Sequence, residues 1–173
     1  MDLASVLPFS PSKIASSPRN VIRQAWDRLS PLPGGKILFS KAIGLSAPYT
    51  ATIDARVEEL RIGYAEVSMA DKRSVRNHLQ CVHAVALCNL LELTGNIALA
   101  YTLPDDARFI VAGLSIEYVK KARGNLRATS ECPPITTSER QEYPVPVSIW
   151  NPQGEEVARG VLQSLVGPKK ERA

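Results

Sequence analysis

The segment LQCVHAVALCNLLELTGNIALAY, residues 79–101, decides the fold because it is apolar on nearly all sides. A helix of this kind is buried, either in the core of a globular protein or in a membrane. Polar residues interrupt the segment at Gln80, His83, Asn89, Glu92 and Asn96. A charged side chain at the centre of a bilayer costs roughly 2.5–3.5 kcal/mol even on a permissive scale. We therefore expect a long helix buried in a globular fold, with no membrane partner.

The segments on both sides of this helix alternate between apolar and polar residues, which is typical of strands with one buried face. Before the helix, a hairpin is predicted over residues 59–69, with Leu60 and Ile62 on its apolar face. After the helix, strands are predicted at 114–118, 126–131, 145–149 and 157–166. Pro144 and Pro146 indicate an edge strand, because proline has no N–H to donate to a neighbour. One long helix among antiparallel strands predicts an α+β domain in which the sheet wraps around the helix.

Two short helices are expected before the first hairpin. Ser17 offers an N-cap and Pro18 a first helical residue for one of them. The second is predicted over residues 36–43, with Gly44 ending it. The expected organisation is a flexible leader at 1–17, a single domain at 18–168 and a charged tail at 169–173.

Composition and charge exclude several classes of protein. A net charge of +4 with 45% apolar residues fits a globular domain and is too weakly basic for a nucleic-acid-binding surface. Three cysteines without paired spacing fit a reducing compartment, and two histidines without a Cys-x-x-Cys motif offer no metal site. The beginning of the chain has no signal peptide and few basic residues. We expect a cytoplasmic protein with no metal and no nucleic-acid partner.

The polar residues in and before the long helix are candidate site residues. A carboxyl group in apolar surroundings is protonated more readily, which would suit Glu92 to acid–base chemistry near neutral pH. The alternative is a structural Glu92 that pairs with Asn89 or Asn96, three and four residues away. His83, near the helix start, can belong to a site or cap the helix. Asn77, in the preceding turn, can belong to a site or hold the turn.

The order Asn77, His83, Glu92 resembles the signature of hotdog-fold thioesterases of the phenylacetyl-CoA type. In that family an Asn is followed six residues later by His-Gly-Gly, and nine residues after this His by a catalytic Asp or Glu. Both spacings occur here. Other segments resemble an uncharacterised hotdog subfamily, namely residues 32–35, 47–49, 76–78, 82–84 and 117–124. The resemblance covers about residues 20–168 and implies a hotdog domain, a dimer and an acyl thioester substrate. CoA or phosphopantetheine would be part of that substrate, and no other cofactor is expected.

Ala84 and Val85 stand where this family has its two glycines. The resemblance implies that a backbone N–H at this point polarises the thioester carbonyl. Ala84 keeps that N–H, so an oxyanion donor at the start of a helix is still expected. The larger side chains narrow the space beside it, which affects either the size of the substrate or the activity itself.

The spacing of the candidate residues requires two chains if the site is catalytic. Nine residues along one helix separate His83 from Glu92 by about 13.5 Å and nearly half a turn. Two antiparallel helices related by a two-fold axis could place Asn77 and Ala84 of one chain opposite Glu92 of the other. We therefore expect a homodimer, or a tetramer built from it. Glu92 would activate water or attack directly, Asn77 would orient the water or substrate, and His83 would shape the loop or assist.

The basic residues Lys120, Lys121 and Arg123 follow the predicted strand that ends at Tyr118. Together with Tyr118 they are candidates for contacts with the substrate. They could bind the phosphates of CoA or the acidic surface of an acyl carrier protein. The alternative is a solvated strand end.

Two other functions compete with hydrolysis on the same fold. Hotdog acyl dehydratases use a His of one chain and an acid on the helix of the other. His78 precedes Glu92 by fourteen residues, a similar spacing, although the proline-rich stretch after their His is missing. A dehydratase or an isomerase is therefore one alternative. The other is a hotdog protein that binds an acyl or aromatic ligand without catalysis, which the missing glycines favour.

Overall fold

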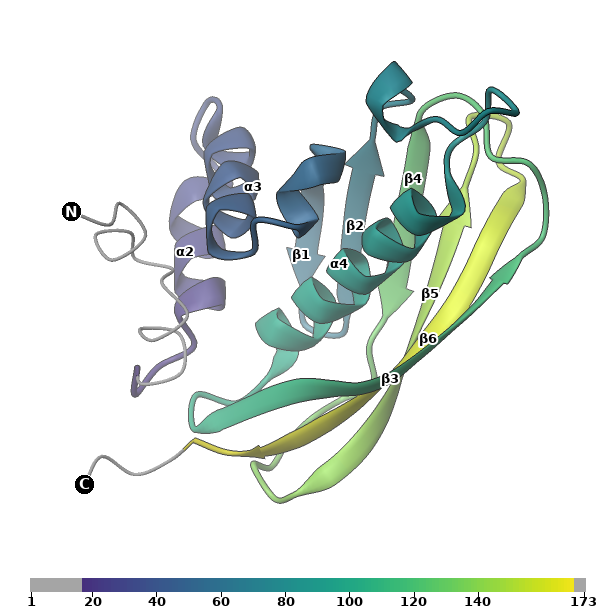
Figure 1. The fold of residues 1–173 in the computed structure, drawn as a ribbon. Coiled ribbons are helices and arrows are strands. Elements are labelled where there is room, and N and C mark those ends of the chain that lie inside the picture. Colours follow the sequence, from purple (N-terminus) through teal and green to yellow (C-terminus); the bar gives the residue numbers. More distant parts are fainter. Residues whose placement is uncertain (1–16, 170–173) are drawn as a thin grey trace.

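The sheet contains six antiparallel strands in a computed structural model that describes residues 17–169 (Figure 1). The strands are β1 (Arg56–Arg61), β2 (Tyr64–Met69), β3 (Ala107–Tyr118), β4 (Leu126–Glu131), β5 (Gln141–Trp150) and β6 (Glu156–Pro168). Their order is β1-β2-β4-β5-β6-β3, so β1 and β3 are the edges. One long helix, α4 (Ala84–Thr102), lies along one face of the curved sheet. This arrangement confirms the predicted α+β hotdog fold.

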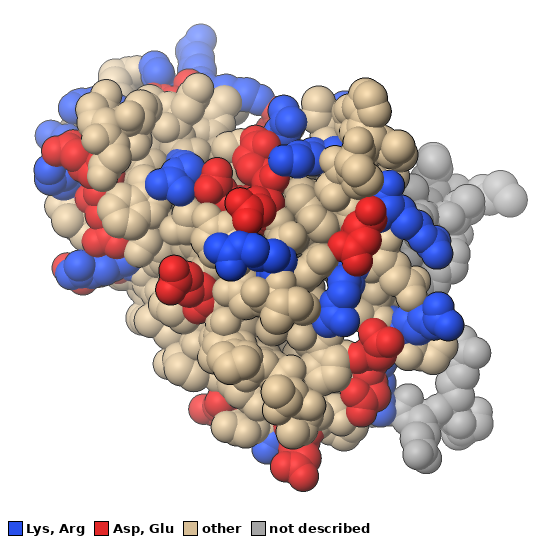
Figure 2. Space-filling view, turned by 180° about the vertical axis from the view of Figure 1, so that it is seen from behind, with Lys and Arg blue, Asp and Glu red and all other residues tan. Residues whose placement is uncertain are grey.

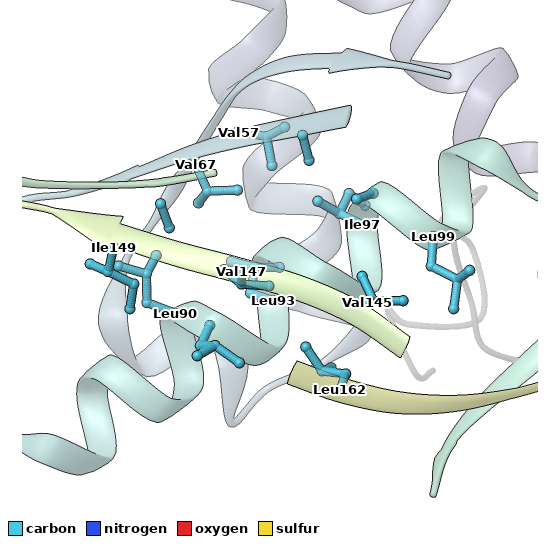
Figure 3. Close-up of a cluster of buried hydrophobic side chains, with 14 of the residues drawn as sticks. Val57, Val67, Leu90, Leu93, Ile97, Leu99, Val145, Val147, Ile149 and Leu162 are labelled. Carbon is cyan, nitrogen blue, oxygen red and sulfur yellow. The ribbon is translucent and has the colours of Figure 1, made fainter. Parts of the chain in front are cut away.

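Helix α4 forms the centre of the core. Its 19 residues are apolar enough for a membrane span, but most are buried against the sheet of the same chain. Leu90 and Leu93 point towards the β5 side chains Val147 and Ile149 (Figure 3). The half-buried residues after the first turn recur every four positions, at Cys88, Glu92, Asn96 and Ala100. With Ala84 they form a narrow stripe, called here the open stripe, on an otherwise buried helix.

Helix α4 begins at Ala84, in agreement with the expected position of His83 near its start, whereas the apolar segment already begins at residue 79. The preceding residues use their backbone groups elsewhere: the Val82 N–H donates to the Ala122 carbonyl, and Gln80 has a positive φ of 53°. Apolar character there reflects burial beneath a loop, since both Cys81 and Val82 are buried. Periodicity alone cannot separate this from a further helical turn.

The two N-terminal helices are present, but both have boundaries different from those predicted. Helix α2 (Val21–Leu29) is capped by Asn20, whose side chain accepts from the Arg23 N–H at 3.0 Å, and not by Ser17. Helix α3 (Gly35–Ser46) continues past Gly44. A Cβ on Gly44 would lie 3.1 Å from that of Ala51, so this glycine provides close packing instead of a helix end. Residues 1–16 of the predicted leader and 170–173 of the predicted tail lie outside the described residues.

Short helical turns and loops connect the main elements. The 3-10 helices are η2 (Thr50–Ile53) and η3 (Arg73–Val75).

Ile62, predicted on the apolar face of the first hairpin, lies instead in its turn and is 58% exposed. The neighbouring Gly63 has a φ of 76°, the left-handed conformation that this turn requires.

The prediction that Pro144 and Pro146 mark an edge strand is wrong in strand order, because β5 lies between β4 and β6. The physical reason for the prediction still holds locally. Strand β4 pairs with β5 only from Val147 to Trp150, so both prolines lie beyond the end of β4. Both prolines pair with β6 alone. Their missing N–H groups therefore interrupt no ladder between β5 and β4.

The free edge of β1 is covered by α3. The Val57 N–H donates to the Ser40 hydroxyl at 2.9 Å, and the Lys36 ammonium donates to the Glu58 carbonyl. These side chains form hydrogen bonds with backbone groups that would otherwise be available for pairing with another strand. Strand β3, at the opposite edge, is twice as long as β1, with 12 residues against 6. Its backbone is therefore the more accessible edge for pairing.

Charged residues of both signs are interspersed on the side of the molecule away from α4 (Figure 2). Several form ion pairs across neighbouring strands, such as Arg127 with Glu66 at 3.1 Å and Arg159 with Glu117 at 2.9 Å. Exposed pairs of this kind contribute little to stability. This side of the sheet is consequently a solvated face without a dominant charge.

Gly160 of β6 allows the β3 backbone and a side chain of α4 to lie close to β6, and replacing it should destabilise the fold. A Cβ there would lie 2.2 Å from the Ser115 carbonyl oxygen and 2.6 Å from Leu91 Cδ1. Backbone cannot rotate away, so Gly160→Ala should lower the free energy of unfolding by about 1–3 kcal/mol. Gly113→Ala, whose new Cβ would make ordinary contacts no closer than 3.8 Å, is the matched control. Urea unfolding curves of equal midpoint for the two variants would contradict this account.

Candidate functional site

The start of α4 presents an available hydrogen-bond donor. The side chain of His83, the N-cap, accepts from the Val85 N–H through Nδ1 at 3.1 Å, which confirms its predicted capping role. The His83 carbonyl accepts from the Leu87 N–H. The Ala84 N–H donates a hydrogen bond to no acceptor within residues 17–169. This N–H lies at the positive end of the helix macrodipole, where an oxyanion is stabilised.

Asn77 organises the turn that leads into α4. Its Oδ1 accepts from the Leu79 N–H at 2.9 Å and the Cys81 N–H at 3.4 Å. Its own N–H donates to the Cys81 carbonyl, which closes the turn. The predicted turn-holding role is therefore present. The side-chain NH₂ group has no acceptor in the described part of the chain, and it remains available to a ligand.

These residues border a hollow of about 350 Å³, called here the helix-start hollow. Its lining includes Asn77, Ala84, Tyr118, Lys120 and Lys121. The Tyr118 hydroxyl donates to the Ala84 carbonyl at 3.3 Å, so the end of β3 is held against the first turn of α4. Burial raises the pKa of Tyr118, which keeps this hydroxyl a donor. The structure thus brings together five of the predicted site residues, whereas His78 and Arg123 are exposed and do not line the hollow.

Glu92 lies two turns along α4 from Ala84, on the open stripe and outside the lining of the helix-start hollow. The predicted structural pairing with its neighbours is absent, because Asn89 donates instead to the Tyr49 carbonyl at 3.2 Å. No hydrogen bond or ion pair to the Glu92 side chain occurs among residues 17–169. Burial, and then the negative charge of Glu92, raises the pKa of Cys88 one turn away. Glu92 is thus a half-buried carboxylate without a fixed partner.

The basic residues near the hollow differ in their available charge. The Lys120 ammonium forms an ion pair with Glu155 at 2.7 Å, and both side chains are about half exposed. Lys121 and Arg123 have no acidic partner in the described part of the chain. The same residues, 17–169, contain no group of three His, Cys, Asp or Glu side chains placed to hold a metal. The free cations at this end suit a phosphate or another anion.

Asp71 is a positioning residue that the sequence did not reveal. Its side chain, only 7% exposed, accepts from Arg76 Nε at 2.7 Å and from the Gly124 N–H at 2.9 Å. These bonds hold the loop before Asn77 against the loop that carries Arg123. In the sequence, Asp71 belongs to a charged loop that resembles a solvated surface. Only the contact with Gly124, 53 residues away, shows its role.

Asp71→Asn should loosen this connection and change the acid sensitivity of the fold. The hydrogen bond from Arg76, followed by that from Gly124, lowers the pKa of Asp71. A group whose pKa is lowered by folding stabilises the fold at pH values above its pKa in the unfolded chain. This stabilisation is lost as the pH falls through the pKa of the folded state. The variant should lose about 1–3 kcal/mol at neutral pH. Its deficit relative to wild type should shrink below about pH 4. Urea unfolding from pH 3 to 7 measures this, and a deficit that grew on acidification would contradict it.

A curved antiparallel sheet around one long helix defines the hotdog fold. The chain belongs to the family DUF4442, described as a domain of unknown function, whose profile matches residues 35–166. The structural-genomics target APC5556 is 33% identical, with a TM-score of 0.73 over 85% of this chain and 98% of its own.

Less similar structures share the fold. A Pseudomonas aeruginosa protein named a probable thioesterase is 19% identical, with a TM-score of 0.67 over 79% of this chain and 97% of its own. A thioesterase family protein from Silicibacter pomeroyi is 16% identical, with a TM-score of 0.63 over 75% and 96% of the two chains. No curated protein matches the chain in sequence.

Proposed function

We propose that this protein is an acyl thioester hydrolase that works as a homodimer in the cytoplasm. The observation that carries the proposal is a pair of complementary groups left unsatisfied within one chain. The Ala84 N–H at the start of α4 has no acceptor among residues 17–169, and the Glu92 carboxylate has no donor there. Two turns of helix separate them, about 12 Å along the axis. In a dimer, the Ala84 N–H of one chain could face the Glu92 carboxylate of the other.

The edges of the sheet support this dimer. Side chains of α3 cover β1, whereas β3 ends the sheet on the other side. The face of β3 that points towards α4 carries Phe109, Val111, Leu114 and Ile116, all only partly buried. A second copy paired along β3 would extend the sheet and bring its own helix over these side chains. The burial of this face would stabilise the dimer.

In the proposed reaction the thioester carbonyl oxygen lies against the Ala84 N–H of one chain. Glu92 of the partner removes a proton from water as that water attacks the carbonyl carbon. The negative charge that develops on the oxygen is stabilised by the N–H and the helix dipole. The tetrahedral intermediate then expels the thiolate, which takes up a proton, and the acid is released. Asn77 orients the water or the carbonyl through its free NH₂ group, while His83 holds the helix start in shape.

The carrier part of the substrate would enter through the helix-start hollow. Lys121 lines this hollow and Arg123 follows two residues later in the same loop, so both could approach CoA phosphates. Lys120 would contribute less, because Glu155 already compensates its charge. An acyl carrier protein, which has an acidic surface, is an alternative source of the same phosphopantetheine thioester. Charge reversal at Lys121 and Arg123 should distinguish the two by its effect on each carrier.

A panel of short, long and aromatic acyl-CoAs, with acyl carrier protein thioesters alongside, tests the proposal through the release of free thiol. Light scattering on the same preparation gives the oligomeric state. Thiol release by a dimeric or tetrameric protein supports the proposal. Loss of water from a hydroxyacyl thioester without thiol release would instead indicate a dehydratase using His78. A tightly bound acyl ligand that is never turned over would indicate a binding protein, in line with Val85 in place of a glycine.

A further inference from the structure

A second hollow, of about 450 Å³, lies between the C-terminal half of α4, the two N-terminal helices and the start of β3. We call it the α2–α4 hollow. Most of its lining is aliphatic, including Val21, Ile22, Ile43, Leu93 and Ile97, and Phe109 is its one aromatic residue among those described. In Figure 1 these elements surround the end of α4 that lies opposite the helix-start hollow. Leu93 directly follows Glu92, so the hollow begins beside the proposed general base.

Asn96 provides an unsatisfied polar group in this apolar lining. Its Oδ1 is buried and has no hydrogen-bond partner among the described residues. The other buried oxygen without a partner in this part of the chain belongs to Ser164, which lines neither this hollow nor the helix-start hollow. A buried amide oxygen without a partner costs free energy, so a group that pairs with it is favoured strongly. Asn96 lies one turn after Glu92 on the open stripe, about 6 Å along the axis.

A hydroxyl group is the ligand chemistry that best satisfies Asn96. Its O–H can donate to Oδ1, and its oxygen can accept from the side-chain NH₂ group. A hydroxyl therefore pairs with either orientation of the amide, whereas a hydrocarbon pairs with neither. The remainder of the lining is mostly aliphatic and favours apolar matter beside that hydroxyl; its polar residues are Asn20, Ser46, Thr50, Arg108 and Lys169.

The extent of the space and its mostly aliphatic lining favour a flexible chain over a single aromatic ring. A further hollow of about 590 Å³ adjoins the α2–α4 hollow and shares Ile43, Thr50 and Leu93 with it. The shared residues belong to α3, η2 and α4, so a ligand could continue from one space into the other. A chain with rotatable bonds can turn at this junction, whereas a rigid ring system cannot.

We propose that the α2–α4 hollow is the acyl pocket, and that the substrate is an aliphatic acyl thioester with a hydroxyl several carbons from the carbonyl. This inference rests on the proposed hydrolase function. Asn96 is then a specificity-determining residue that reads the hydroxyl. Helices α2 and α3 are walls of the pocket, and Ile43 limits how far the chain extends.

The test compares decanoyl-CoA with analogues that carry one hydroxyl, moved from the fourth to the seventh carbon, on wild type and Asn96→Leu. Wild type should prefer one hydroxylated analogue by about tenfold in kcat/KM, the effect of one net hydrogen bond. Asn96→Leu should lose this preference, so that its kcat/KM for the favoured analogue falls to its own value for decanoyl-CoA. Ile43→Trp should reduce activity on decanoyl-CoA more than on butyryl-CoA, because it fills the junction of the two hollows.

Binding separates failure of this inference from failure of the hydrolase proposal. Calorimetry with wild-type protein measures the dissociation constant for decanoyl-CoA and for each hydroxylated analogue without requiring turnover. Hydrolysis without a hydroxyl preference, or a preference that Asn96→Leu retains, would overturn the pocket assignment alone. If no thioester is hydrolysed, the hydrolase proposal fails, and the affinity difference between the two ligands still decides the role of Asn96.

Discussion

Glu92→Gln is expected to lower kcat for thioester hydrolysis by roughly 10²–10⁴-fold, the contribution typical of a general base. The substitution keeps the size of the side chain and removes its ability to take a proton. No residue between 17 and 169 pairs with Glu92, so its replacement breaks no hydrogen bond within the chain. The melting temperature should therefore stay close to that of the wild type. Thiol release under saturating substrate measures the effect on kcat.

The matched control is Glu142→Gln, an equivalent change at an exposed position of β5 outside the site. It should leave kcat unchanged. The affinity of Glu92→Gln for acyl-CoA should also remain near the wild-type value, because the proposed role of Glu92 is in the transition state. Wild-type turnover by Glu92→Gln would exclude it as the base. A loss of binding in parallel with kcat would indicate a role in substrate contact instead.

The elements of the fold were largely predictable because buried residues recur with one period along a helix and with another along a strand. The strand at Leu126–Glu131 was predicted with its observed bounds, since one face packs against α4 and the other meets solvent. The position of β5 within the sheet was not predictable, because strand order depends on pairing between distant segments. Pro144 and Pro146 indicated a missing neighbour correctly, yet that neighbour is missing over only half of the strand.

The candidate site was predictable to the extent that it follows the chain. Asn77, His83 and Ala84 lie within one turn and helix start, so their spacing already placed them together. Tyr118 joins them through a bond between residues 34 apart, and Asp71 supports them through one between residues 53 apart. Such contacts leave no local pattern. The unsatisfied oxygen of Asn96 is likewise a property of packing, because a polar residue on a helix ordinarily finds a partner.

Ala84→Pro and Glu92→Gln should each be nearly inactive alone and should restore activity when combined in one dimer. Proline at the first residue of a helix is tolerated, and His83 has the extended conformation that precedes proline, with φ −66° and ψ 140°. The substitution therefore removes the Ala84 N–H with little change in backbone. Losing one oxyanion donor should lower kcat by about 10²–10³-fold. Ala84→Gly keeps the N–H and should remain active, which makes it the control.

The mixed dimer distinguishes a shared site from one built within a single chain. If Ala84 of one chain works with Glu92 of the other, each mixed dimer has one intact site and one with both defects. Random reassociation of equal amounts should then recover about a quarter of the wild-type activity. A site within one chain would recover none, because every chain carries a defect. Co-expression with two affinity tags isolates the mixed dimer, in which about half of the sites should be active. Activity no higher than that of either parent would exclude the shared site.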